Sequence, residues 1–315
     1  MKKIILTVGI FLAAVFCLKA DLNPISSVTN DVTCRALFLK EMARKSEELK
    51  LETAYFENAS GLTPNSRITV SDLTKIALAA LKEPDLARIW AETDCEIQIT
   101  GPNPRKEVLV HAYKKYMKTW GDFVKQYKFL GGKGGSLFYR KPPLSTRSHV
   151  LVTEVEGQKI LITFAGALFH EDAFLYDIEI INLAKAMMRG EEVVLQGLLK
   201  DFEAKGGAFE FVTLTGKKLS YSSKYVNMPH VPASTTKIVA TLCLLDHVKD
   251  LSTKLTVRES DIVGGSGFKC YAGDQMTYED AIRALMLPSS NTIANSVASN
   301  VGAMILEKRI KDIER

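Results

Sequence analysis

The chain has 315 residues, of which 46% are hydrophobic and 24% are charged, a balance typical of folded globular proteins rather than disordered ones. The formal net charge is only +5, and no stripe of lysine and arginine with interleaved aromatic residues occurs, so a nucleic-acid partner is not expected. This length allows one large domain or two small ones.

The first twenty residues have the pattern of a secretory signal peptide. Lys2 and Lys3 form a basic start, residues 4–18 are mostly apolar, and Ala20 is a small residue suited to cleavage. The pattern predicts export to the periplasm or cell envelope. A membrane-anchored form is the alternative if the leader is retained.

The following segment, up to residue 170, shows helical patterns first and β-like patterns later. Ser71-Asp72 precedes a run of apolar residues at helical spacing and is expected to cap that helix. The expected elements are helices over 32–51 and 71–81, a strand over 106–112, a helical connection over 114–130, and strands over 136–140, 147–155 and 158–166.

The remaining residues return to helical patterns after one more hairpin. The expected elements are a long helix over about 173–204 that ends at Gly206-Gly207, a hairpin across 215–217, a buried helix over 234–245, and helices over 278–287 and 292–310. Strands that follow one another, with helices before and after, predict an α+β fold in which helices flank an antiparallel β-sheet.

The most informative motif is Pro232-Ala233-Ser234-Thr235-Thr236-Lys237, which an apolar run follows. A spacing of three places Ser234 and Lys237 on one helix face, where the amine can reach the hydroxyl and activate it as a nucleophile. The helix N-terminus adds backbone N–H groups that suit an oxyanion. The alternative is that Ser234 only caps a core helix. Ser266 and Lys269 share the spacing, but they lie in a glycine-rich run.

Two further motifs are weak when each is considered alone. Ser289-Ser290-Asn291 lies between two expected helices, where a hydroxyl and a carboxamide can enter a cleft or simply cap a helix. Lys133-Gly134-Gly135 precedes a strand, and glycine lets a ligand approach the backbone closely. A second Lys-Gly-Gly at Lys205 is explained by the end of a helix.

Together these motifs resemble the penicillin-binding serine enzymes, which combine S-x-x-K, S-x-N and K-T-G. The chain is most similar to the low-molecular-mass D-alanyl-D-alanine carboxypeptidases. Residues 211–237 resemble that family's opening hairpin and nucleophile helix, and residues 278–295 resemble its second motif. Residues 56–73 resemble the stretch that normally follows, and 131–135 resemble the third motif. The resemblance implies a DD-peptidase/β-lactamase-like fold with a helical subdomain.

The order of the motifs differs from that of the family and implies a circular permutation. After the signal peptide at 1–20, a single domain over 21–315 is expected. Its first part, 21–170, carries the K-T-G-like motif, a helical connector spans 171–207, and 208–315 carries the other two motifs. The alternative is a rearranged gene whose halves pair between two chains.

The resemblance also implies catalytic roles. Ser234 is the expected nucleophile on the carbonyl of a terminal D-Ala–D-Ala bond, Lys237 its base, and Ser289 the relay that passes a proton to the leaving amine. Water then releases the acyl-enzyme. The implied activity is that of a serine-type carboxypeptidase on peptidoglycan stem peptides, with β-lactam antibiotics as covalent inhibitors.

The substrate-binding residues implied by the resemblance are Asn291, Lys133, Gly134, Gly135 and Ser136. Asn291 is expected to hold the substrate amide, and the backbone N–H of Ser136 is expected to complete an oxyanion hole with that of the nucleophile. Lys133 is expected to attract the terminal carboxylate. Gly134 stands where the family has a threonine whose hydroxyl helps to bind that carboxylate.

Two alternative functions follow. The loss of the threonine and the altered order favour a penicillin- or peptidoglycan-binding homologue with impaired turnover. A serine β-lactamase is the other, but Glu57-Asn58-Ala59-Ser60 does not fit the Glu-x-x-Leu-Asn pattern that a deacylating glutamate would need.

No cofactor or metal is expected, because no Cys-x-x-Cys or Cys/His cluster has metal-ligand spacing. The five histidines are scattered, which gives no support to a serine–histidine–aspartate mechanism. Cys34, Cys95, Cys243 and Cys270 either form two disulfides in one of three pairings or include a free buried thiol at Cys243.

Overall fold

The computed structural model describes residues 24–140, 143–168 and 170–314, so the predicted signal peptide lies outside the described residues. A five-stranded antiparallel sheet forms the centre, with the strand order β3-β4-β5-β6-β7. Two separate two-stranded antiparallel sheets are formed by β1-β2 and by β8-β9. The strands are β1 Asp94–Ile99, β2 Arg105–Val110, β3 Lys128–Arg140, β4 Pro143–Val155, β5 Gln158–Ala167, β6 Ala208–Thr213, β7 Ser220–Ser222, β8 Lys254–Thr256 and β9 Gln275–Thr277.

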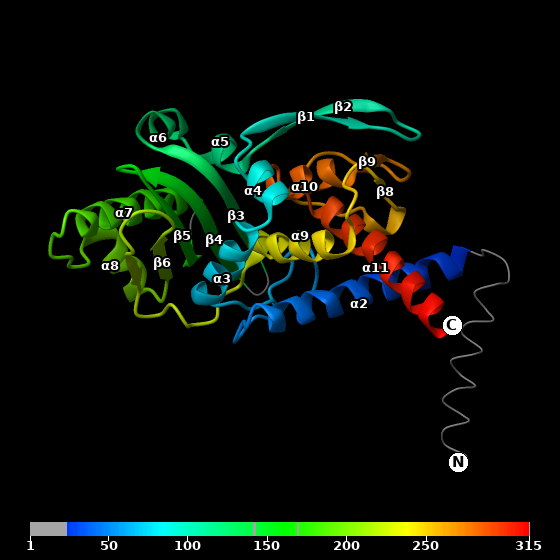
Figure 1. The fold of residues 1–315 in the computed structure, drawn as a ribbon, viewed down its shortest axis with the longest axis horizontal. Coiled ribbons are helices and arrows are strands. Elements are labelled where there is room, and N and C mark those ends of the chain that lie inside the picture. The colour runs from blue at the N-terminus through cyan, green and yellow to red at the C-terminus, as the bar shows by residue number, and fades with distance from the viewer. Residues whose placement is uncertain (1–23, 141–142, 169, 315) are drawn as a thin grey trace, which may run out of the picture.

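Helices cover both faces of the sheet (Figure 1). In that view α7 and α8 lie on one side of the strands, and α3, α9 and α2 lie on the other. The helices are α2 Pro24–Glu48, α3 Val70–Ala80, α4 Pro84–Trp90, α5 Ala112–Tyr116, α6 Trp120–Gln126, α7 His170–Met188, α8 Gly197–Ala204, α9 Thr236–His247, α10 Tyr278–Met286 and α11 Asn291–Ile313, with 3₁₀ turns η1 Ala233–Thr235 and η2 Glu259–Asp261.

The two sheet faces bury separate hydrophobic cores because successive strand residues point to opposite faces. On β4, Val150 and Val152 belong to the larger core, which α2, α3, α9, α10 and α11 complete. Leu151 between them belongs to the smaller core, formed with α7 and α8. The prediction of an α+β fold with an antiparallel sheet between helices is therefore confirmed.

The sheet joins strands from both ends of the predicted connector. β5 pairs with β6 from Ile160↔Thr213 to Ala165↔Ala208, so residues on either side of 171–207 share one sheet within this chain. The prediction of one long helix over 173–204 is wrong, because α7 ends at Met188 and α8 begins only at Gly197. Gly190 has a φ of +74° just beyond α7, and the chain is not helical between α7 and α8.

Other boundaries also differ from the sequence expectation. In place of the helical connection expected over 114–130, two short helices are formed, of which α5 already begins at Ala112, and β3 begins at Lys128. The cap of α3 is Thr69 rather than Ser71-Asp72, because the Thr69 hydroxyl accepts a hydrogen bond from the Asp72 backbone N–H at 3.0 Å. Helix α4 and strands β1, β8 and β9 were not expected.

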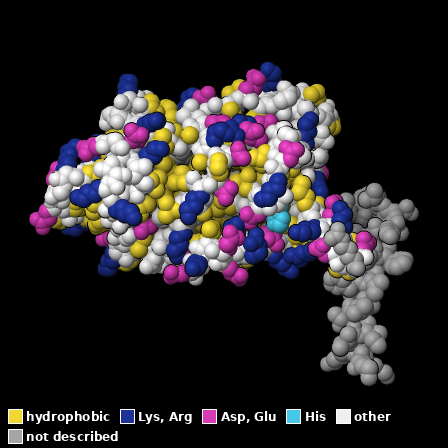
Figure 2. Space-filling model, in the orientation of Figure 1, with side chains coloured by type: hydrophobic (Ala, Val, Ile, Leu, Met, Phe, Trp, Pro, Cys, Tyr) yellow, Lys and Arg dark blue, Asp and Glu magenta, His cyan; other side chains and the backbone are white. Residues whose placement is uncertain are grey.

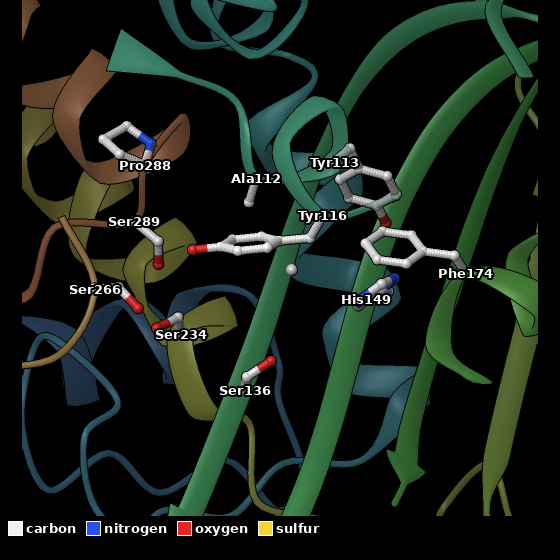
Figure 3. Close-up of a pocket in the computed structure, with 11 residues that line it drawn as sticks. Ala112, Tyr113, Tyr116, Ser136, His149, Phe174, Ser234, Ser266, Pro288 and Ser289 are labelled. Carbon is white, nitrogen blue, oxygen red and sulfur yellow. The ribbon is translucent and has the colours of Figure 1, made fainter. Parts of the chain in front are cut away.

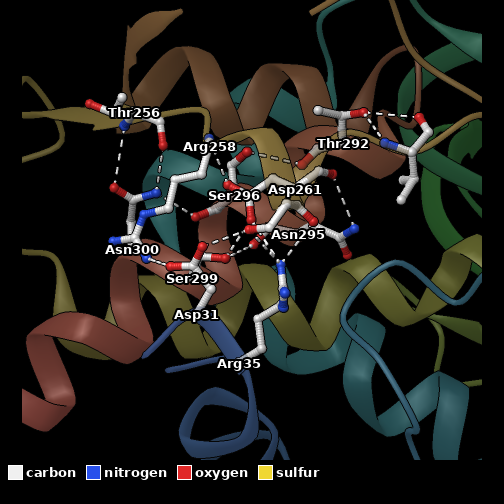
Figure 4. Close-up of polar contacts among 12 residues, drawn as sticks. Asp31, Arg35, Thr256, Arg258, Asp261, Thr292, Asn295, Ser296, Ser299 and Asn300 are labelled. Carbon is white, nitrogen blue, oxygen red and sulfur yellow. Dashed lines mark hydrogen bonds and ion pairs between the residues drawn. The ribbon is translucent and has the colours of Figure 1, made fainter. Parts of the chain in front are cut away.

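A buried polar network fixes α2 against the C-terminal part of the chain (Figure 4). Asp261 is fully buried and accepts hydrogen bonds from Arg35 of α2 at 3.1 Å and from Ser299 of α11. Arg258 contacts Asp31 of α2 in the same network. These contacts fix α2, and the segment that follows α2 carries Ser60, a residue of the candidate site.

The face shown in Figure 2 carries Lys/Arg and Asp/Glu side chains interspersed with one another.

Within the described ranges, no helix combines the length and the apolar character that crossing a membrane requires. Cys34, Cys95, Cys243 and Cys270 are free thiols in the structure, so none of the three possible disulfide pairings among them is present.

Candidate active site

Ser234 lies in a constrained turn at the start of α9. The preceding Ala233 has a φ of +49°, a left-handed conformation that is unfavourable for a residue with a side chain. The turn is held by Thr235, whose hydroxyl donates to Pro232 O at 2.8 Å. Gly61 lies against it so closely that a Cβ there would stand 1.8 Å from Ala233 O. Backbone strain at functional sites persists only where the surroundings over-determine it, as they do here.

Lys237 lies one turn further along α9 and contacts the Ser234 hydroxyl. Its Nζ is 2.9 Å from Ser234 Oγ, 2.7 Å from Ser60 O and 2.8 Å from Asn291 Oδ1. Two of these partners are carbonyl oxygens that can only accept. A neutral amine has two N–H donors and one lone pair. It can therefore donate to both carbonyls while its lone pair accepts the Ser234 proton.

The electrostatics favour this neutral form. Lys237 is fully buried, and burial lowers the pKa of its amine well below 10.5. The positive charge of Lys133 lowers that pKa further. The amine of Lys237 thus reaches the Ser234 hydroxyl, the contact that their spacing predicts.

Ser289 and Lys133 form the second pair of the site. Lys133 Nζ donates to Ser289 Oγ at 2.9 Å and to Gly134 O at 2.6 Å. Ser289 has a φ of +64°, which marks another strained position. Burial lowers the pKa of Lys133 to about 7. Residues from β3 and from the end of α10, distant in sequence, therefore meet.

Asn291 begins α11 and connects the two motifs of the C-terminal part. Its Oδ1 accepts from Lys237, and its Nδ2 donates to Gly264 O at 3.1 Å, which fixes the orientation of the carboxamide. The neighbouring Ser290 caps α11 through a bond from Ile293 N–H. The capping role that the sequence left open for this motif thus belongs to Ser290, and Ser289 is left for the pocket.

The β3 edge lies directly beside the nucleophile turn. A Cβ at Gly135 would stand 2.6 Å from Pro232 O and 3.0 Å from Ser234 N, so only glycine permits this approach. Ser136 and Ser234, the two residues expected to form an oxyanion hole, line the same pocket. Gly134 also lines it.

The pocket has a volume of about 120 Å³ and contains several side chains that sequence reasoning missed. Figure 3 shows the Tyr116 hydroxyl pointing toward Ser289 across the opening. No short sequence motif marks these residues, because different elements bring them together. The lining residues are Ala112, Tyr113, Tyr116, Gly134, Ser136, His149, Phe174, Ser234, Ser266, Pro288 and Ser289.

The C-terminal part of this site has a counterpart among known families. Residues 192–314 match the model of the Beta-lactamase enzyme family. The match includes Ser234, Lys237, Ser289 and Asn291, and it supports a serine hydrolase. Lys133 and the β3 strand lie outside the matched range. Neither a curated protein nor a solved structure matches the chain.

Within the described ranges, no group of three or more His, Cys, Asp or Glu side chains could hold a metal ion.

Proposed function

We propose that this protein is a serine-type D-Ala-D-Ala carboxypeptidase that removes the terminal D-alanine from peptidoglycan stem peptides. The observation that carries the proposal is the 2.9 Å contact between Ser234 Oγ and the buried amine of Lys237. A hydroxyl becomes a nucleophile at neutral pH only with such a base beside it. The family match over residues 192–314 supports the hydrolase class.

In the acylation step, Ser234 Oγ attacks the carbonyl carbon of the scissile amide while its proton passes to Lys237 Nζ. The developing oxyanion is stabilised by the backbone N–H groups of Ser234 and Ser136. The C–N bond then breaks, and Ser289 delivers its hydroxyl proton to the departing amine of D-alanine while it takes a proton from the charged Lys133 Nζ, 2.9 Å away. Water hydrolyses the ester on Ser234, which restores the hydroxyl and releases the shortened peptide.

The substrate carboxylate is proposed to lie near Lys133. With a pKa of about 7, this amine is partly deprotonated at neutral pH in the free protein. A bound carboxylate would favour its charged form and raise that pKa. Asn291, which accepts from Lys237 through Oδ1 and donates to Gly264 O through Nδ2, is the proposed partner of the substrate amide, and one of these two contacts would be exchanged on binding.

The domain organisation and location are part of the proposal. The pairing of β5 with β6 supports a single domain over 21–315, with 171–207 as connector, in which the permuted order folds within one chain. The basic and apolar leader supports export to the periplasm or cell envelope, where peptidoglycan and β-lactams are encountered.

The test is labelling of the purified protein with a fluorescent penicillin, alongside Ser234→Ala. A covalent adduct that requires Ser234 is expected, together with release of D-alanine from a stem-peptide mimic. Absence of the adduct would refute the acyl-enzyme mechanism.

Gly134 favours one further candidate, a binding homologue with impaired turnover, because the position lacks a hydroxyl to orient the carboxylate. That candidate predicts a stable Ser234 adduct without D-alanine release. Rapid hydrolysis of the penicillin itself would instead favour a β-lactamase.

A further inference from the structure

A buried histidine–aspartate pair lies beside the position where Gly134 leaves space. His149 on β4 pairs with Gly134 on β3 in the sheet register. Its Nδ1 is 2.9 Å from Oδ2 of Asp177 on α7. The side chains are 3% and 1% exposed. The rings of Tyr113, Phe164 and Phe174 surround the imidazole.

The free edge of the imidazole faces the pocket. With Nδ1 directed to Asp177, the Nε2–Cδ2 edge lies next to Gly134, where a Cβ would stand 3.4 Å from Nε2 and 3.6 Å from Cδ2. Both residues line the pocket, and Figure 3 shows His149 on the strand next to that of Ser136. A threonine at 134 would direct its γ atoms into space that the ring now limits.

The chemistry of the pair decides what Nε2 presents. A buried pair with no net charge is either an aspartate with an imidazolium or a protonated aspartic acid with a neutral imidazole. In the second state the carboxyl donates to Nδ1, so the ring proton is on Nε2. Nε2 therefore carries a proton in both states. In the remaining state, an ionised Asp177 accepts from the Nδ1–H of a neutral imidazole and Nε2 has no proton. That state has a net negative charge, which is costly to bury. Burial raises the pKa of Asp177, which disfavours an ionised aspartate beside a neutral imidazole.

We infer that His149, oriented by Asp177, donates an Nε2–H hydrogen bond to the substrate's carboxylate beside Lys133, in place of a hydroxyl on residue 134. The inference rests on the proposed function for the identity of the substrate. His149 is a specificity-determining residue, and Asp177 is a positioning residue. Selectivity for a free carboxylate is thereby built from β4 and α7 rather than from β3 alone.

The test compares acylation of Ser234 by a fluorescent penicillin and by its methyl ester, which lacks the free carboxylate. The main variant is His149→Val with Asp177→Leu, since replacing both partners leaves no unpaired buried charge. Loss of one charge-assisted hydrogen bond should reduce the acid-to-ester rate ratio by about ten- to hundredfold. The ester rate should stay within about threefold, which a general loss of structure would not allow.

Two further variants sharpen the comparison. Gly134→Thr added to the double variant should restore part of the acid preference, because the ring no longer limits the threonine side chain. His247→Gln, a histidine at the far end of α9, is the matched control and should keep the wild-type ratio. An unchanged ratio in the folded double variant would overturn the inference.

A binding measurement keeps this result separate from the fate of the proposed function. In Ser234→Ala protein with ¹⁵N-labelled histidine, N-acetyl-D-alanine should shift the Nε2 signal of His149, and N-acetyl-D-alaninamide should not. Failure of the wild type to form an adduct would refute the proposed function. The titration would then still decide whether His149 binds a carboxylate. Equal responses to the two ligands would refute the role of His149 even in an active enzyme.

Discussion

Replacement of Lys237 by methionine tests whether this amine is the base of the site. Methionine has a similar length and remains compatible with a fully buried helix position. Ser234 then has no group to accept its proton, and general-base assistance contributes roughly a factor of 10² to 10⁴. We therefore expect the rate of acylation by penicillin to fall about a thousandfold, equivalent to about 4 kcal/mol in the activation free energy.

The structure also indicates how stability should respond. Ser60 O and Asn291 Oδ1 each lose their contact with the amine, at about 1–3 kcal/mol for each acceptor that stays unpaired. Removal of a strongly desolvated amine acts in the opposite direction. The variant should consequently stay folded while it loses acylation.

The assay is the second-order rate of adduct formation, measured from pH 5 to 10 and accompanied by urea unfolding. Lys45→Met is the matched control, because Lys45 is also buried but contacts Asp246 at 2.7 Å, away from the pocket. It should lose stability and keep its acylation rate. Because the pKa of Lys237 lies well below 10.5, protonation of this base should lower the rate only at pH values far below 10. Loss of the proton from Lys133, whose pKa is about 7, should lower the rate on the alkaline side as well, since the penicillin carboxylate then loses its positive partner. Two results would refute the role of Lys237 as a neutral base. One is acylation of Lys237→Met within about tenfold of the wild-type rate, and the other is a wild-type rate that already falls as the pH is lowered from 10.

Three more predictions concern Lys133, the glycine of β3 beside the nucleophile turn, and the buried network around Asp261. The pKa of Lys133 falls from 10.5 to about 7 on folding, so the unfolded chain binds more protons between these values. The unfolding free energy of wild type relative to Lys133→Met should thus rise by about 1 kcal/mol per pH unit from pH 7 to 10 in urea titrations, and a constant difference would contradict the neutral buried amine. Gly135→Ala should cost about 1–3 kcal/mol and abolish the adduct, because its Cβ overlaps the backbone of the nucleophile turn. Gly121→Ala, with nothing within 4 Å of its Cβ, should do neither. Asp261→Ala should lower the unfolding free energy by about 3 kcal/mol, since Arg35 loses its buried carboxylate; thermal denaturation unchanged from wild type would refute this.

Local patterns gave the spacing of the site residues within each motif. Ser234 lies in the 3₁₀ turn η1 and Lys237 in the first turn of α9, and a spacing of three brings side chains together across such consecutive helical turns. The preference of serine for helix N-caps left a capping role open for the Ser289-Ser290-Asn291 motif, and in the structure Ser290 takes that role. The succession of β-like runs, with helical patterns before and after them, likewise predicted the α+β class.

The glycines at 190 and 197 show where that local information was insufficient. A helical pattern over 173–204 extended across both, although a left-handed φ at Gly190 marks the end of α7. The short strands β8 and β9 stayed hidden because three residues are too few to show a period.

The His149–Asp177 pair depended on tertiary structure alone. The two residues are separated by a hairpin and part of a helix, and neither belongs to a motif that sequence spacing can identify. The sequence determined which hydroxyls and amines lie one helical turn apart, because hydrogen bonding within a helix fixes that geometry. Only the packing of β3 and β4 against η1 and α7 decided which charges are buried together. Desolvation, and with it the protonation of Lys237, Lys133 and Asp177, depends on neighbours from every part of the chain.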